Sequence, residues 1–332
     1  SMMGITLAAS LLRAVRTDAK LIIMGDYEQL PSIEAGNVLY DIIQSGVVPV
    51  STLDVVKRQA AGSGILHNAN EILDGNVIHS EITNKSGIAG NAYHYKADNA
   101  LSCRNQIVNM VDRLLNKGYS IDNIQILCPQ KKTDIGVDSL NYAIQRIVNP
   151  QSGHEVPSKK IQVKDMNGKP SAIMLTLREG DKVIHTVNNY EMKYYRFEKG
   201  SGFVEVLGQK GIVNGETGRV ARIKKNNSHT QIYVQYGDNL YARYEDDWTS
   251  LSLAYAMTIH RAQGSQWPIV IAPIMLCNRI MLSRKLFYTL YTRGQTTDII
   301  FGTPDAIEYA VNNVISAQRN TGLREKLRSL AK

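Results

Sequence analysis

Short apolar runs that are followed directly by polar loops constrain the fold of this chain most. Leu21–Met24 is such a run, and it follows a stretch with helical apolar spacing from Leu7 to Val15. Residues 124–128 and 267–272 repeat the apolar pattern. Continuous runs of this length are typical of strands buried in a parallel sheet. They predict an α/β fold in which the loops at the carboxyl ends of the strands bind ligands.

Amphipathic segments between and after these runs predict helices. Their apolar residues recur three or four positions apart, and Gly, Lys-Gly or a Thr-Pro pair marks several of the ends. The predicted helices are 7–15, 65–74, 101–116, the segment after Gly136 with Leu140, Ile144 and Ile147 facing inward, 286–292, the segment after Thr303-Pro304, and 323–330.

The stretch from Asp181 to Trp248 has a different pattern, because short runs with strand character alternate with turns such as Asn214-Gly215 and Gly237-Asp238. This pattern predicts a small antiparallel barrel inserted into the α/β framework. Several aromatic and basic residues of the segment either contact a single nucleic-acid strand or cover a small core. These residues are Tyr190, Tyr194, Tyr195, Arg219 and Arg222.

Composition and charge narrow the class of protein. With 332 residues, of which 43% are hydrophobic and 20% charged, the chain can bury two or three cores. No apolar run approaches the roughly 20 residues that span a bilayer, so we expect a cytoplasmic protein without membrane contact. The formal charge of +8 favours a polyanionic partner. The cysteines, Cys103, Cys128 and Cys277, form no Cys-x-x-Cys pair, so we expect buried thiols and no metal site.

Polar side chains that suit phosphate chemistry follow three apolar segments. Residues 25–32 carry Asp26 and Gln29, although an ordinary turn uses similar residues. Arg58 ends a run at 55–56, where an arginine can bind phosphate or form a surface ion pair. After residue 251 the chain reaches a third polar segment, which contacts phosphates or bases. Its candidate residues are Thr258, His260, Gln263 and Gly264, the last of which permits close approach of the backbone.

The order of these blocks along the chain resembles the RecD/TraA family of superfamily 1B DNA helicases. The blocks are Gly25-Asp-x-x-Gln-Leu-Pro-Ser, Arg58-Gln59-Ala60 with Gly62-Ser63-Gly64, Pro129 with Ile135-Gly136, Gly180-Asp-Lys-Val-Ile with Asn188-Asn189-Tyr190, Val213-Asn-Gly-Glu-x-Gly218, Tyr255-Ala-x-Thr258-Ile-His260-x-x-Gln263-Gly264-Ser265, and Tyr288-Thr-x-x-Thr292-Arg293. They extend over nearly the whole chain.

The resemblance implies RecA-like P-loop NTPase motor domains, the first of them incomplete, with an inserted SH3-like β-barrel. Residues 1–83 are then part of the first motor domain. Residues 92–186 and 249–332 form the second motor domain, and residues 187–248 form the barrel. The implied activity is 5′-to-3′ movement along single-stranded DNA and duplex unwinding, driven by ATP and Mg²⁺ as the two motor domains close.

The resemblance also assigns roles to individual residues. Gln29, Arg58 and Arg293 sense the γ-phosphate or stabilise charge on it. Asp26, Gly264 and Gln266 line the nucleotide site. The residues implied to contact DNA are Thr258, His260, Gln263, Asn188 and Asn189.

The 332 residues contain no Gly-x-x-x-x-Gly-Lys-Ser/Thr, the loop that holds the phosphates of ATP. We therefore expect the chain alone to hydrolyse no ATP and to bind single-stranded DNA weakly. Nuclease or helicase subunits are possible partners. The alternatives are a non-catalytic module that binds single-stranded nucleic acid and a structural subunit of a helicase–nuclease complex.

Overall fold

The chain divides into two compact units. The computed structural model describes residues 2–53, 63–78, 91–150, 153–164, 169–226, 228–314, 319 and 321–331. Unit 1 comprises Ser1–Lys96, Ala262–Val270 and Ile274–Lys332, and unit 2 comprises Ala97–Arg261 and Ile271–Pro273. Strand β13 (Trp267–Ile274) has residues in both units. The mixture of helices with parallel strands confirms the predicted α/β class.

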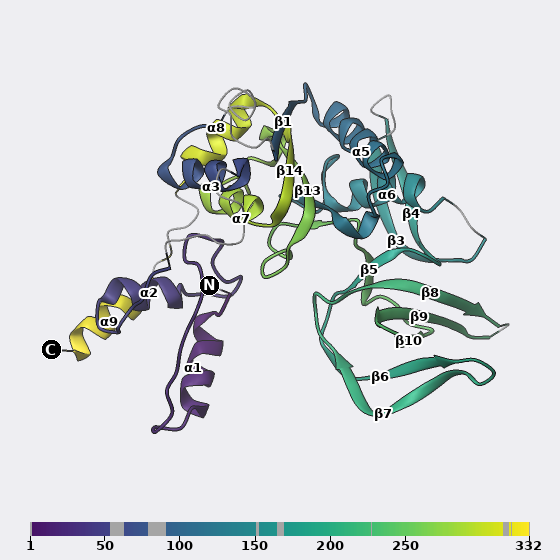
Figure 1. The fold of residues 1–332 in the computed structure, drawn as a ribbon, viewed down its shortest axis with the longest axis horizontal. Coiled ribbons are helices and arrows are strands. Elements are labelled where there is room, and N and C mark those ends of the chain that lie inside the picture. Colours follow the sequence, from purple (N-terminus) through teal and green to yellow (C-terminus); the bar gives the residue numbers. More distant parts are fainter. Residues whose placement is uncertain are drawn as a thin grey trace. The chain divides into compact units, whose positions relative to one another are not determined.

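Unit 1 contains a parallel strand pair and several helices (Figure 1). In this pair, β1 runs beside β14 with Ala92 opposite Asp298 and Lys96 opposite Gly302. The elements of the unit, besides part of β13, are α1 (Ile5–Ala14), α2 (Val38–Ser45), α3 (Gly64–Asp74), β1 (Ala92–Lys96), the short 3₁₀ helix η2 (Leu276–Asn278), α7 (Arg284–Tyr291), β14 (Gly294–Gly302), α8 (Pro304–Asn312) and α9 (Leu323–Leu330).

Helix α3 shows why the sequence pattern predicted these helices well. Ile65, Ala69 and Ile72 lie four and three positions apart, and all three are buried where α3 packs against α7. The helix ends at Asp74 because Gly75 adopts a left-handed backbone with φ of 85°, a conformation that disfavours side chains with a Cβ. The predicted helix and its end are both confirmed.

The predicted strand at Leu21–Met24 is wrong. This segment is irregular, and the side chains of Ile22 and Met24 are 81% and 87% exposed. An apolar run forms a buried strand only when neighbouring strands satisfy its backbone and cover both of its faces. Among the described residues, no strand pairs with this segment.

Unit 2 combines a second parallel pair with an antiparallel sheet (Figure 1). Its helices and parallel strands are α5 (Ala100–Asn116), the 3₁₀ helix η1 (Ile121–Asn123), β2 (Ile124–Cys128), α6 (Val137–Val148) and β12 (Ala256–Thr258). Its antiparallel strands are β3 (Glu155–Lys164), β4 (Pro170–Arg178), β5 (Lys182–His185), β6 (Asn189–Glu198), β7 (Gly202–Ile212), β8 (Thr217–Lys225), β9 (Thr230–Gly237), β10 (Leu240–Glu245) and β11 (Leu251–Leu253).

Only two of the three side chains of α6 that were predicted to face inward are buried. Leu140 and Ile144 are fully buried, but Ile147 is 36% exposed, so its predicted inward position is wrong. Ile147 lies in the last turn, which ends at Val148, where it lines a surface cavity together with Ile173 of β4. The helical period placed the side chain on the correct face, but at this end the face is only partly covered.

The antiparallel strands of residues 182–253 form one sheet in the order β11-β5-β8-β9-β10-β6-β7. The short runs predicted between Asp181 and Trp248, which are residues 183–187, 211–214, 218–223, 231–236 and 240–244, lie in or beside strands of this sheet, whereas β6 and the separate β3–β4 pair were not predicted. Tyr194 and Tyr195 are each only 6% exposed, so they cover the core of the sheet, whereas Tyr190 is 66% exposed. The pattern thus predicted the sheet, while its closure into an SH3-like barrel stays a prediction.

The cysteines are not all buried. Cys103 and Cys128 are inaccessible, and burial raises the pKa of the Cys128 thiol far above its usual range. Cys277 is exposed, which contradicts the prediction, because it lies in η2 just beyond the buried strand β13.

No helix within the described ranges is both long and apolar enough to cross a membrane.

Candidate nucleotide and nucleic-acid site

A cavity of about 580 Å³ in unit 1 brings together most of the predicted nucleotide residues. Its apolar wall comes from the N-terminal segment, including Leu21–Met24. The residues of its polar wall come from positions far apart in the sequence and are Asp26, Gln29, Gln263, Gly264, Gln266 and Arg293. The cavity therefore has the clustered hydrogen-bonding groups that a polar ligand requires.

Arg293 occupies the centre of this polar wall and is only 3% exposed. Its Nη2 donates to Oε1 of Gln29 at 3.0 Å and to Oγ1 of Thr292 at 2.9 Å. Its Nη1 donates to the Ser265 carbonyl at 3.2 Å, and its Nε donates to the Thr289 carbonyl at 3.0 Å. These four bonds, all to neutral oxygens, fix the plane of the guanidinium.

Gln29 is held from both ends of its amide. While Oε1 accepts from Arg293, Nε2 donates to Oδ2 of Asp26 at 3.0 Å. The same Asp26 oxygen accepts from the Tyr288 hydroxyl at 3.1 Å, and Oδ1 accepts from the Glu28 amide at 2.9 Å. Burial, together with the Asp26 carboxylate, raises the pKa of Tyr288, which keeps its hydroxyl as a donor.

Helix α7 holds the loop that carries Gln29. The Lys285 ammonium donates to the Tyr27 carbonyl at 2.5 Å, and the Thr289 hydroxyl accepts from the Leu30 amide at 2.8 Å. The sequence prediction did not include Lys285, Tyr288 or Thr289 in the site. Their spacing of three and four positions places them on one helical face that leads to Arg293, and this polar face was the signal that could have indicated them.

The segment from Gln263 to Gln266 supplies the remaining wall. Gln263 donates to the Leu30 carbonyl at 2.7 Å, and Gln266 donates to the Thr292 carbonyl at 3.3 Å. Gly264 has a φ of 83°, a conformation that disfavours larger residues. Gln263 thus contacts the loop that carries Gln29, so the structure brings together residues to which the sequence assigned separate roles in DNA and nucleotide binding.

The donors of the cavity fit the phosphates of ATP better than its acceptors fit Mg²⁺. A guanidinium with amide neighbours is suited to anionic oxygens. The two oxygens of Asp26 already accept three hydrogen bonds, so this carboxylate is committed to the protein rather than presented to a cation. Mg²⁺ would be held mainly by the phosphates of the nucleotide.

Two predicted DNA contacts lie in unit 2. Thr258 ends β12 opposite Cys128 of β2, and its hydroxyl accepts from the Arg261 amide at 3.3 Å. His260 follows the strand and is half-buried, and burial lowers the pKa of its imidazole. Its ring is therefore neutral near pH 7 and presents one donor and one acceptor.

Asn188 and Asn189 precede and begin β6, also in unit 2. Asn188 is exposed, with its oxygen accepting from the Asn214 amide at 2.8 Å and its nitrogen donating to the Tyr190 hydroxyl at 3.2 Å. The Asn189 oxygen accepts from the Glu191 amide at 3.1 Å. These residues shape the start of the strand, and the exposed Tyr190 lies beside them.

Arg58, the remaining predicted site residue, lies outside the residues that the structure describes.

Comparison with known proteins identifies helicases. Residues 253–299 match the family model of the UvrD-like helicase C-terminal domain, and residues 1–89 match that of an AAA domain. The chain is 30% identical over 329 residues to the ATP-dependent RecD2 DNA helicase of Deinococcus radiodurans, covering 99% of this chain and 39% of that protein. It is 26% identical over 341 residues to the RecBCD enzyme subunit RecD of Mycolicibacterium smegmatis, covering 99% and 53%.

Solved structures that resemble the chain include Pif1 helicases. One is the Pif1 helicase from Bacteroides in complex with ADP-AlF3 and single-stranded DNA, with 15% identity, a TM-score of 0.41, and coverage of 83% of this chain and 60% of that one. The chain spans about half the length of its curated relatives or less. The sequence relatives and the matched helicase domain confirm the resemblance to DNA helicases of the RecD/TraA type.

Proposed function

We propose that the chain is the portion of an ATP-dependent DNA helicase that senses the nucleotide and contacts single-stranded DNA. The observation that carries the proposal is the hydrogen bond between Arg293 and Gln29 on the wall of one cavity. A γ-phosphate oxygen is anionic and accepts hydrogen bonds more strongly than the Gln29 amide does. Arg293 would therefore move its hydrogen bond from the Gln29 amide to the γ-phosphate of ATP. The Gln29 side chain would then be free of Arg293.

In this proposal each predicted site residue has its own role. Arg293, together with Arg58, stabilises charge on the transferring phosphoryl group, and Gln29 reports the γ-phosphate to the loop that it shares with Asp26. Gln263 links that loop to the segment after Thr258 and His260, which contact the DNA strand. Gly264 and Gln266 border the nucleotide, and Asn188 and Asn189 contact DNA beside the inserted sheet, which we expect to close as an SH3-like barrel.

The whole protein would move 5′ to 3′ along one strand and unwind duplex DNA, with nuclease or helicase subunits as possible partners. The 332 residues by themselves are expected to hydrolyse no ATP, because they contain no phosphate loop. The domain boundaries at residues 83, 92, 187 and 249 belong to this proposal. A non-catalytic binding module is the second candidate, and the neutral His260 and the exposed Tyr190 would suit it equally well.

Two measurements test the proposal. Fluorescence anisotropy with a labelled oligo-dT should give binding to the 332-residue chain that weakens at least about tenfold between 50 and 200 mM salt, because phosphate contacts release counterions. Binding that ignores salt would contradict a phosphate-led mode, and DNA-stimulated ATP hydrolysis would overturn the predicted inactivity. Binding that requires an added partner protein would favour a structural subunit.

Hydrogen exchange tests the nucleotide site directly. Millimolar ATP with Mg²⁺ should slow amide exchange at residues 26–30 and 289–293. Arg293→Ala should abolish this protection, whereas Arg279→Ala should keep it, because Arg279 is exposed, directly follows η2 and does not line the cavity. Equal protection in both variants would remove Arg293 from the site, and protection in neither the wild type nor the variants would favour the binding module.

A further inference from the structure

The chain passes from one sheet to another at Ala254 and Tyr255. Strand β11 ends at Leu253 and pairs with β5 of the antiparallel sheet, whereas β12 begins at Ala256 and pairs with β2. The two linking residues are fully buried. The Ala254 amide donates to the Lys182 carbonyl at 2.8 Å, and the Tyr255 carbonyl accepts from the Ile126 amide at 3.2 Å. The remaining polar groups of the link need other partners in order to be buried without a large cost.

Two buried side-chain amides satisfy this link. Gln125 of β2 donates from Nε2 to the carbonyls of Ala254 and Tyr255, each at 3.1 Å. Asn141 of α6 donates to the carbonyls of the two flanking residues, Leu253 at 3.2 Å and Ala256 at 2.9 Å, and accepts from the Ala256 amide at 2.8 Å. Gln125 is itself oriented by Lys182, whose ammonium donates to Oε1 at 3.1 Å.

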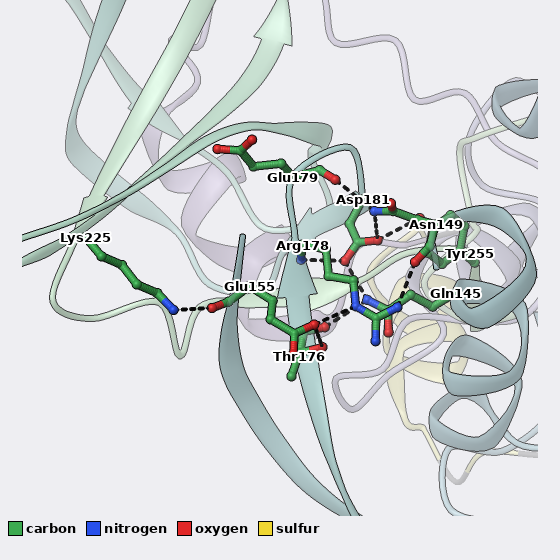
Figure 2. Close-up of polar contacts among 9 residues, drawn as sticks. All are labelled: Gln145, Asn149, Glu155, Thr176, Arg178, Glu179, Asp181, Lys225 and Tyr255. Atoms are coloured by element: carbon green, nitrogen blue, oxygen red, sulfur yellow. Dashed lines mark hydrogen bonds and ion pairs between the residues drawn. The ribbon is translucent and has the colours of Figure 1, made fainter. Parts of the chain in front are cut away.

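The side chain of Tyr255 is fixed by Asp181, as Figure 2 shows. Asp181 is fully buried and directly precedes β5, the strand that pairs with β11. Its carboxylate accepts from the Tyr255 hydroxyl at 2.9 Å, from Gln145 at 2.6 Å and from Asn149 at 2.7 Å. It also accepts from the backbone amide of Arg178 at 2.8 Å.

The Arg178 guanidinium hydrogen-bonds groups other than this carboxylate, as Figure 2 shows. Its Nε donates to Glu155 at 2.9 Å, and its Nη1 donates to the Asn149 carbonyl at 2.7 Å. The Asp181 carboxylate is therefore held by four neutral donors in a buried position. A buried anion tolerates little displacement of such donors, so the network fixes one geometry.

We propose that Asp181 and Tyr255, together with Gln125 and Asn141, position Thr258 and His260 for DNA by fixing where the chain leaves the antiparallel sheet. Thr258 follows Tyr255 by only three residues along a strand that pairs with β2. A displacement of Tyr255 would thus be carried directly to Thr258 and His260. This role rests on the proposed function, in which those two residues contact the strand; none of the four positioning residues is itself a DNA contact.

Hydrogen exchange tests the positioning without DNA. Tyr255→Phe removes one hydroxyl donor and leaves Asp181 three others, so the chain should fold. Tyr244→Phe is the matched control, because Tyr244 is 2% exposed and its hydroxyl hydrogen-bonds His185 at 2.9 Å and Tyr236 at 2.7 Å within the antiparallel sheet. Amides of residues 254–260 should exchange about fivefold faster in Tyr255→Phe and within about twofold of wild type in Tyr244→Phe. Equal changes there in both variants would overturn the proposal.

Binding of labelled oligo-dT then links the geometry to function. Tyr255→Phe should weaken binding about fivefold, and Tyr244→Phe should bind like wild type at a similar loss of melting temperature. Faster exchange at 254–260 with unchanged DNA affinity would overturn the positioning role while leaving the proposed function intact. Failure of the wild-type chain to bind DNA, with exchange as predicted, would instead contradict the proposed function and retain the structural link.

Asp181→Asn provides a second variant. It replaces an oxygen that accepts hydrogen bonds with an amide nitrogen, which would face the donors of Gln145, Asn149 or Tyr255. The expected result is a larger increase in exchange at 254–260 than in Tyr255→Phe, together with weaker oligo-dT binding. An Asp181→Asn chain with wild-type exchange and wild-type affinity would overturn the proposal.

Discussion

Arg293 and Gln29 share a hydrogen bond of 3.0 Å between Nη2 and Oε1, although 264 positions separate them in the sequence. The bond joins the end of helix α7 to the loop that follows Gly25, and Asp26 holds the other end of the same amide. Neither block of sequence therefore forms the site alone. The guanidinium already has its geometry before any phosphate arrives, which lowers the entropic cost of ligand binding.

Arg293→Lys should destabilise the chain. A lysine ammonium lies at one point and cannot replace the planar fork that reaches Gln29, Ser265 and Thr289 together. The free energy of unfolding should fall by about 1.5–3 kcal/mol, the range for losing hydrogen bonds from a charged group. Urea unfolding followed by circular dichroism measures the change. Arg279→Lys in the exposed turn that follows η2 is the control, and an equal effect there would show that the Arg293 contacts contribute nothing specific.

Asp298→Val should stabilise the chain at neutral pH. Asp298 lies in β14, is fully buried, and neither carboxylate oxygen has a hydrogen-bond partner in the described residues. Burial raises its pKa well above the usual range, and the nearby Arg293 charge opposes this only in part. Replacing the unpaired group with an apolar β-branched side chain should raise the free energy of unfolding by about 1–3 kcal/mol at pH 8.

The gain from Asp298→Val should depend on pH. Because the folded-state pKa of Asp298 is raised, the folded chain holds a proton that the unfolded chain releases above about pH 4. Wild-type stability should therefore fall as pH rises from about 4 toward the folded-state pKa, and the advantage of Asp298→Val should grow from pH 5 to pH 8. Urea unfolding at both values measures it, and a gain that is the same at pH 5 and pH 8 would contradict the buried-carboxyl explanation.

Lys182 should make the free energy of unfolding depend on pH in the alkaline range. Burial lowers the pKa of its ammonium to about 8, below the value near 10.4 of an unfolded lysine. Between these values the unfolded chain binds more protons, so stability should rise with pH by at most about 1.4 kcal/mol per unit. Below pH 8 the cost of burying the charge is constant. Lys182→Met should flatten the slope between pH 8 and 10, and a slope that persists unchanged in this variant would assign it to other groups.

Local sequence patterns predicted the elements that depend on local chemistry. The end of α3 at Gly75 and the fully buried run of β2 were readable, because a left-handed glycine and a continuous apolar run each have one common structural use. Leu21–Met24 has the same apolar character but no neighbouring strand in the described residues, and a single sequence does not contain the information about which neighbours are present. Exposure of Ile147 has a similar origin, since cover comes from distant elements.

The candidate site likewise has a part that local motifs predicted and a part that they did not. Ordered motifs predicted that Asp26, Gln29, Gln266 and Arg293 would serve one ligand, and one cavity contains all four. The motifs did not predict that Thr289 would fix the Gln29 loop or that Asp181 would bind Tyr255, because these bonds join segments 259 and 74 positions apart. Long-range hydrogen bonds of buried side chains become visible only when the fold brings their partners together.

The C-terminal segment holds the loop that follows Gln29 through Arg319. Arg319 donates to the carbonyls of Ser32 at 2.5 Å, Glu34 at 2.6 Å and Gly36 at 2.7 Å. Arg319→Ala should speed amide exchange at residues 32–37 by about fivefold or more, because three carbonyls lose a charged donor. Hydrogen-exchange mass spectrometry measures it, with Arg324→Ala as control, since Arg324 pairs only with the adjacent Glu325 among the side chains of α9. Arg319→Lys should restore part of the protection, because one ammonium reaches fewer carbonyls than a guanidinium does. Protection that survives Arg319→Ala would show that the loop holds its own conformation and that the C-terminal segment merely lies against it.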